Sequence, residues 1–405
     1  MNRNPSQWRR VDLIAVAAGF SLVEVMVALT LGVFLTLGVI KIVSVSKGIY
    51  LSNAAIARMQ ENGRYALGIV TRNIRMAGFT GCSREQPITN LLNNSSTVWW
   101  ENFATSATAA SGVSIRGYDG TQDFPSTDCL PDVQFTTVTG GKRIGATDAL
   151  IALGGDGGYP VKVNGSTSLI LSSITKPSGA TLKPYDLLIA CDTSNVSLFQ
   201  ATSVSTTAPN YTVGHTRLTT TCSGQTCPPG QTCPGNSDAT LSVSSSAPAA
   251  QIGLRDYIPT AFYIGNSATC GTGACALPHS LYQLQFILGA MVAQEVTEGV
   301  QDMQIFYGED DPIVNDPLGT GLPDGVVDIY RDATSVVNWN NVLAVRISLL
   351  MATLEDNIVP QPQSYQWPAD TGDAAKFGRT STATDRRYYQ VFATTVGIRN
   401  RLTGG

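Results

Sequence analysis

One carboxylate stands at the edge of a long apolar run and limits what the N-terminal part of this chain can do. Glu24 directly precedes the uncharged run Val25 to Ile40, which Lys41 closes. As a helix rising ~1.5 Å per residue, these roughly 16 residues cover most of a ~30 Å hydrocarbon layer. An unpaired charge in such a layer costs about 2.5–3.5 kcal/mol even on the mildest scale, so Glu24 needs a cationic partner.

Proteolysis would supply that partner. A cut between Gly19 and Phe20 creates an α-ammonium group four residues before Glu24, on the same helical face or on a neighbouring copy. The ion pair would neutralise both groups in lipid or in a packed helical bundle. Two alternatives stay open: an uncut signal anchor from Leu13 to Ile40, and a secretory cleavage near Ala15-Val16-Ala17, whose preceding apolar region is short.

The stretch Gly19-Phe20-Ser21-Leu22-Val23-Glu24 resembles the class III signal of type IV pilins and type II secretion pseudopilins. The resemblance implies that a prepilin peptidase cuts after Gly19 and N-methylates Phe20, and that Glu24 guides assembly. The three arginines of the leader lie further from the cut than is usual in that family. They still satisfy a positive-inside orientation, with the leader cytoplasmic and the remainder outside.

Beyond Lys41 the pattern stays helical and becomes amphipathic. It predicts one helix from Phe20 to about Met76, with Gly78 as its cap. Such a helix is about 85 Å long, so residues 20–43 need lipid or other subunits and the second half needs its own domain. The segments 60–67 and 74–82, the latter ending in Gly78-Phe79-Thr80-Gly81-Cys82, resemble PilW-type minor pilins of the type IV pilus.

Three later segments carry the same resemblance. They are residues 298–308, where Thr297 stands at the position of a family valine, residues 345–350, and residues 385–401. In all, the likeness covers about residues 19–82, 185–204 and 280–401. It implies an α+β, pilin-like fold, in which the second half of the long helix packs on an antiparallel β-sheet domain with large loop insertions.

The expected organisation has four parts. A leader (1–19) precedes the helix (20–78), a divergent loop-rich insertion with short strands (79–184) follows, and a β-rich pilin domain (185–405) carries a Cys-rich loop at 222–250. Alternating or short apolar runs predict strands at 149–153, 169–171, 281–286, 303–307, 343–350 and 388–398. The runs 185–192 and 196–202 are expected to pair as a hairpin.

Eight cysteines in a chain directed out of the cytoplasm are read first as disulfides. About 105 pairings are possible, so connectivity stays open. Cys270 with Cys275 is the easiest pair to close locally, and Cys227 with Cys233 and Cys82 with Cys129 are weaker candidates. A zinc site at Cys222, Cys227 and Cys233 is the alternative, which the long spacing disfavours.

An acidic stretch is the one metal-like cluster. Hard oxygen ligands near glycines suit Ca²⁺, and the candidates are Asp310, Asp311, Asp316, Asp324 and Asp328. The spacing is not that of the twelve-residue calcium loop, and prolines interrupt it, so a solvated acidic turn is the favoured alternative. Catalysis is not expected, since the chain has two histidines and no nucleophile elbow, Walker loop or His-Glu-x-x-His helix.

Charge and family resemblance together define the expected function. The net charge is −4, and loss of a leader carrying +2 leaves −6, which argues against a nucleic-acid binder. Arginines near the C-terminus, Arg386, Arg387, Arg399 and Arg401, are expected on a solvated face or in ion pairs with the acidic stretch. A partner interface or DNA is the less favoured alternative for them.

The expected protein is a minor pilin for pilus assembly or initiation, with a link to twitching motility and cell adhesion. It would sit as a single-pass protein in the bacterial inner membrane, with its C-terminal domain periplasmic, and later on the pilus. Its expected partners are other minor and major pilins, the prepilin peptidase, the inner-membrane assembly platform and a tip adhesin. A type II secretion pseudopilin and a signal-anchored periplasmic binding or adhesive protein remain alternatives.

Overall fold

The computed structural model describes most of the chain between Phe20 and Arg401. The described residues are 20–82, 88–93, 114–122, 142–165, 167–175, 179, 181–217, 235–243, 251–267, 279–287, 290–311, 313–314, 323–367 and 379–401. The chain divides into two compact units, one ending at Ala54 and the other beginning at Ala55.

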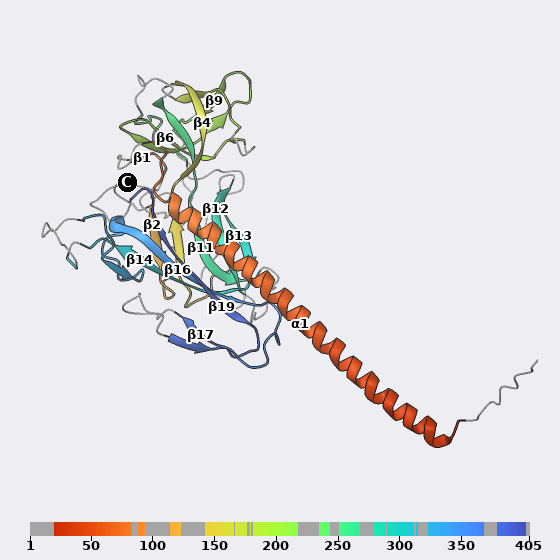
Figure 1. Ribbon diagram of the computed structural model, residues 1–405. Coiled ribbons are helices and arrows are strands. Elements are labelled where there is room, and N and C mark those ends of the chain that lie inside the picture. The colour runs from red at the N-terminus through yellow and green to blue at the C-terminus, as the bar shows by residue number, and fades with distance from the viewer. Residues whose placement is uncertain are drawn as a thin grey trace, which may run out of the picture. The chain divides into compact units, whose positions relative to one another are not determined.

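The long helix α1 spans Leu22–Met76, as its pattern predicted. Its buried residues recur every three or four positions and belong to the second unit: Ala55, Met59, Gly63, Ala66, Val70 and Ile74. This spacing places them on one face of an α-helix. Gly78 has a φ of +78°, the left-handed conformation that ends many helices, so the predicted cap is confirmed. Figure 1 shows α1 in orange.

The described residues of the second unit form four sheets. The eight-stranded sheet has the order β1 (Ile88–Asn90), β7 (Val196–Gln200), β6 (Leu187–Cys191), β10 (Gly253–Tyr257), β4 (Gly155–Asn164), β5 (Ser168–Leu171), β9 (Tyr211–Gly214), β8 (Ser203–Val204). The five-stranded sheet has the order β13 (Ala290–Glu298), β12 (His279–Ile287), β11 (Thr260–Asn266), β3 (Ala149–Ala152), β2 (Ile115–Tyr118). The four-stranded sheet has the order β15 (Ile329–Arg331), β14 (Val300–Glu309), β16 (Val342–Ala352), β19 (Tyr389–Gly397), and β17 (Ser364–Trp367) pairs with β18 (Arg379–Thr382).

All of these strand pairs are antiparallel except β1 with β7. A 3₁₀ turn, η2 (Trp339–Asn341), precedes β16. The long helix and the antiparallel sheets together confirm the expected α+β, pilin-like class.

Strand β6 is buried on both faces, which explains its continuous apolar sequence. Leu187, Ile189 and Cys191 face a core shared with residues of the five-stranded sheet, such as Tyr263 and Leu284. The alternate residues, Leu188 and Ala190, belong to a second core that includes Phe199. The predicted hairpin is confirmed, because β6 pairs with β7 in the register Ile189 opposite Leu198.

The second half of α1 packs on the five- and four-stranded sheets. Met59, Ala66, Val70 and Ile74 share one core with residues of β3, β11, β14 and β16. Gly63 is part of this contact, because a Cβ atom added there would lie 2.9 Å from the ring of Phe392 on β19. The amphipathic half of the helix therefore has its own domain to cover it, as predicted.

The predicted boundary between residues 184 and 185 does not separate compact units. The strands β2 and β3 complete the five-stranded sheet with β11, and β4 pairs with both β5 and β10. Residues on both sides of the predicted boundary thus share sheets and cores. Long gaps between short apolar runs resembled an insertion, but antiparallel pairing joins strands that are distant in sequence.

Candidate assembly segment and the disulfide-linked helix end

The first unit consists, in its described part, of an exposed apolar helix. Every residue from Phe20 to Leu51 is exposed. Among the residues that the structure describes, α1 is the one helix long and apolar enough to cross a membrane. The hydroxyls of Thr30 and Thr36 donate to the carbonyls of Val27 and Gly32, so these two side-chain donors are satisfied within the helix. Such a surface is stable only when lipid or protein covers it.

Glu24 lies in the first turn of α1. A carboxylate at this position faces the positive end of the helix dipole. The helix ladder begins beside it, with the Val25 amide donating to the Ser21 carbonyl at 3.1 Å. Glu24 is exposed and forms no ion pair with the described residues. Gly19 lies outside the described residues, so the processing of Gly19 and Phe20 and the role of Glu24 stay predictions.

The opposite end of α1 turns sharply toward the eight-stranded sheet. Gly78 and Gly81 both have positive φ, of +78° and +92°, which residues with a Cβ rarely adopt. A Cβ at Gly81 would also collide with the Arg255 side chain. The Arg255 guanidinium lies 5.1 Å from the centre of the Phe79 ring and donates to the carbonyls of Gly81 and Gly157. These contacts account for the Gly-Phe-Thr-Gly-Cys sequence.

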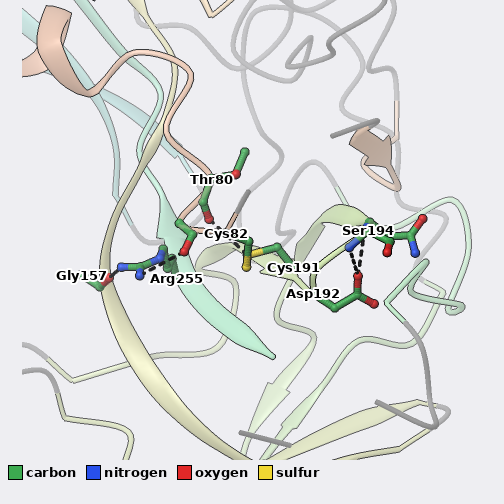
Figure 2. Close-up of a disulfide and its surroundings, with 9 residues drawn as sticks. Thr80, Cys82, Gly157, Cys191, Asp192, Ser194 and Arg255 are labelled. Carbon is green, nitrogen blue, oxygen red and sulfur yellow. Dashed lines mark hydrogen bonds between the residues drawn. A yellow bond between two sulfur atoms is a disulfide. The ribbon is translucent and has the colours of Figure 1, made fainter. Parts of the chain in front are cut away.

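A disulfide joins this turn to strand β6. Cys82 is bonded to Cys191, with a Cα–Cα distance of 6.0 Å, and Figure 2 shows the bond beside Thr80 and Arg255. The Cys191 sulfur lies 3.4 Å from the Thr80 carbonyl oxygen. Gly253 on β10 leaves room for the bond, because a Cβ there would lie 3.1 and 3.2 Å from the two sulfurs.

The prediction that Cys82 pairs with Cys129 is therefore wrong. Cys82 follows the end of α1, where the turn brings it to Cys191 at the end of β6. Cys129, Cys222, Cys227, Cys233, Cys270 and Cys275 lie outside the described residues. The other two predicted pairs, and the zinc alternative, stay untested predictions.

The acidic stretch at the end of β14 accepts hydrogen bonds from backbone amides. Glu309, Asp310 and Asp311 are 1%, 2% and 7% exposed. Asp310 accepts hydrogen bonds from the amides of Asp324 and Gly325, at 3.3 and 2.6 Å. This part of the stretch is thus a buried scaffold and not the solvated turn that the sequence favoured.

Further charge pairing completes this scaffold. Arg331 forms ion pairs with Glu309, at 3.1 Å, and with Asp311. Asp328 accepts a hydrogen bond from the Asp311 amide at 2.9 Å. Asp316 lies outside the described residues, and no group of three acidic, histidine or cysteine residues within them could hold a metal ion. Calcium binding stays a prediction.

Two of the C-terminal arginines bind backbone carbonyls. Arg387 donates to the carbonyls of Thr353 and Leu354 and pairs with Asp385 at 3.3 Å. Arg401 donates to the carbonyls of Trp339 and Val342, and burial lowers its pKa to about 10. The expected ion pairs between these two arginines and the acidic stretch are absent from the described residues. Arg386 and Arg399 are exposed, as predicted.

Sequence reasoning missed a buried polar cluster between the sheets. Arg143 is 0% exposed and donates to the carbonyls of Asp119 and Thr147, at 3.1 and 2.8 Å. Asp148 accepts a hydrogen bond from the Ile305 amide at 2.8 Å, and burial raises its pKa well above the ordinary value. These residues lie in a short segment without hydrophobic periodicity, so no sequence signal marked them.

Comparison with known proteins gives a match for the C-terminal part of the chain. The family model for type IV pilus-assembly protein W, PilW, matches residues 261–400, which contain nearly all of β11 and every strand from β12 to β19. This part of the chain is similar to a PilW-type pilin domain. No curated protein and no solved structure gives a significant match.

The match to PilW confirms the resemblance that the segments 298–308, 345–350 and 385–401 indicated. It indicates a role in type IV pilus assembly and contacts with other pilus components. The apolar N-terminal helix is compatible with membrane anchoring. The matched family is described as an assembly protein, in agreement with the absence of a catalytic motif from the sequence.

Proposed function

We propose that this chain is a minor pilin of the type IV pilus that acts in assembly or initiation. The observation that carries the proposal is the combination of a PilW-type domain with an N-terminal helix whose apolar residues are exposed from Phe20 to Leu51. A soluble protein would bury such a surface. A membrane precursor that later packs into a helical bundle needs it exposed.

The proposed mechanism is assembly without chemistry at the filament. The precursor sits in the inner membrane as a single-pass protein with its C-terminal domain in the periplasm. A prepilin peptidase then cuts after Gly19 and methylates Phe20, and the new α-ammonium pairs with Glu24 of the same or a neighbouring subunit. The apolar helix leaves lipid for the bundle of other minor and major pilins, assisted by the inner-membrane platform.

The size of the domain supports a position near the start of the filament. In its described residues, the second unit, from Ala55, carries four sheets beside one helix, more than a filament body requires. We place the protein in an initiating or tip complex, where a tip adhesin is a further partner. Calcium bound by Asp310, Asp311, Asp316, Asp324 and Asp328 remains the proposed, untested cofactor.

Mass spectrometry of the mature N-terminus and a Glu24→Ala variant test the proposal. We expect an N-methylated Phe20 and a loss of incorporation into pili for Glu24→Ala. Glu61→Ala, which removes an exposed carboxylate further along the same helix, is the matched control and should incorporate normally. An intact leader in assembled pili, or normal incorporation of Glu24→Ala, would overturn the proposal.

The phenotype of a deletion strain separates the alternatives. Loss of surface pili and twitching supports the minor pilin, whereas loss of protein secretion with intact pili supports a type II pseudopilin. A signal-anchored periplasmic protein would keep its leader and affect neither process.

A further inference from the structure

Of the two glycines in the part of α1 that belongs to the second unit, Gly68 meets no neighbour within the described chain. Gly68 lies in the middle of the helix, where glycine is less favourable than alanine. A Cβ atom at Gly63 would press on the Phe392 ring, but one at Gly68 would find nothing within 4 Å. The buried residues Ala66 and Val70 lie two positions to either side, so Gly68 points directly away from the domain core.

The surface around Gly68 combines an aromatic ring with positive charge. We call it the Gly68 face, and it consists of Arg64, Tyr65, Gly68, Arg72 and Arg75. Arg64, Tyr65 and Arg72 are three or four positions from Gly68 and therefore neighbour it on the helix surface, and Arg75 lies three positions beyond Arg72 on the same side. Tyr65 is 55% exposed, although a tyrosine ring offers a large apolar area for burial.

The charge of this face is opposite to that of the chain. From Ala55 to Met76, α1 carries four arginines and one glutamate, or +3, while the whole chain is −4. Arg72 forms an ion pair with Asp156 at 3.2 Å. Arg58, which lies outside the Gly68 face, forms one with Glu355 at 3.3 Å. Arg64 and Arg75 are exposed and have no ion pair with the described residues.

We propose that the Gly68 face is a docking site for an acidic helix or strand of another subunit of the assembly. A glycine without a Cβ lets a partner's backbone or bulky side chain approach the helix axis closely. Tyr65 would cover one side of the inserted group, and Arg64 and Arg75 would pair with carboxylates at its rim. Naming the partner as an assembly subunit rests on the proposed function; the location of the site does not.

Cross-linking from Tyr65 tests this docking site in the full-length chain. A photoreactive benzoylphenylalanine replaces Tyr65 in cells that make the protein, and cross-linked peptides are identified by mass spectrometry. We expect a peptide of another pilus subunit with aspartate or glutamate beside the linked residue. The cross-link yield should fall at least tenfold in Gly68→Phe and in the double variant Arg64→Glu/Arg75→Glu.

Matched variants separate docking from folding. Gly145→Phe adds the same ring at another exposed glycine with nothing within 4 Å of its Cβ, and should leave the yield unchanged. Arg64→Lys/Arg75→Lys keeps the charge and should retain most of the yield. If Gly68→Phe lowers the Tm of the purified protein, the two arginine double variants decide the outcome.

Three results would overturn the docking site: an unchanged yield in Gly68→Phe and Arg64→Glu/Arg75→Glu, cross-links only to lipid, or cross-links only within the same chain. Failure here and failure of the proposed function are distinguishable. If Glu24→Ala blocks incorporation while the Gly68 variants cross-link as the wild type does, the function stands and the docking site is wrong. If the mature chain keeps its leader, the function is wrong, and the cross-link still decides the site.

Discussion

Cys82 and Cys191 are 109 residues apart in sequence, and their bond closes a loop that contains β1 to β5. Closing a loop of this length removes much of the conformational freedom of the unfolded chain. We predict that Cys82→Ser/Cys191→Ser lowers the free energy of unfolding by roughly 2–5 kcal/mol. The measurement is urea unfolding of the full chain in detergent, monitored by circular dichroism.

The same experiment in reductant provides the control for the disulfide variant. In reductant, the urea midpoint of the wild-type protein should fall toward that of the double serine variant. The midpoint of the variant should change less than that of the wild type when reductant is added. Equal midpoints for the oxidised wild type and the serine variant would show that the bond does not stabilise the fold.

His215 supplies a second prediction at the residue scale. Its Nδ1 lies 2.9 Å from the Ala239 carbonyl oxygen, its ring packs edge-to-face on Phe199, and burial lowers its pKa from 6.5. The native state therefore binds fewer protons than the unfolded state below pH 6.5. Stability should fall as pH drops through this value, by at most ~1.4 kcal/mol per pH unit for one group.

His215→Asn should flatten this pH dependence, because asparagine keeps an N–H donor for Ala239 and does not titrate. The measurement is Tm between pH 7.5 and 5. Burial also lowers the pKa of His279, so the variant should retain part of the slope. A slope equal to that of the wild type contradicts the assignment to His215.

At the scale of elements, α1 contains a matched pair of glycines. Gly68→Ala should stabilise the protein by about 0.5–1 kcal/mol, because alanine favours the helix and meets no neighbour. Gly63→Ala should destabilise it by about 1 kcal/mol, since its Cβ would lie 2.9–3.1 Å from the Phe392 ring. Thermal unfolding of the two variants checks the prediction, and a stabilising Gly63→Ala would contradict the packing of β19 on α1.

The same helix shows what sequence can predict and where it stops. The helical repeat of apolar residues and Gly78 predicted the extent of α1 and its C-terminal end, because both signals depend on local geometry. The β6–β7 hairpin was likewise predictable from two apolar runs and a short turn, in which Asp192 accepts from the amides of Ser194 and Asn195. Local signals of this kind identify elements but not their distant partners.

The partners of Cys82, Asp310 and Arg401 were not predictable for that reason. Each binds a residue brought close only by the tertiary fold: Cys191, Gly325 and Val342. The acidic stretch was read as a solvated turn or a calcium site because charge alone does not reveal burial. Pairing a buried carboxylate with backbone amides compensates its desolvation, which makes such burial possible without a metal.

At the scale of the whole molecule, the two units differ in what they need for stability. None of the core clusters in the described residues includes a residue before Ala55. The first buried apolar side chains of α1 are Ala55, Met59 and Ala66, which are 6%, 3% and 0% exposed, and the last two belong to a core cluster. The second unit should therefore fold without the apolar half of the helix.

Two deletions test this independence. A chain that begins at Ala55 should be soluble without detergent and keep the strand signal and Tm of the full chain. A chain that begins at Leu67 loses Met59 and Ala66 from the core and uncovers Phe392, so it should lose about 3 kcal/mol or more of stability. If both shortened chains lose the same amount of stability relative to the full chain, the whole of α1 contributes to folding. The claim that only its second half stabilises the domain would then be wrong.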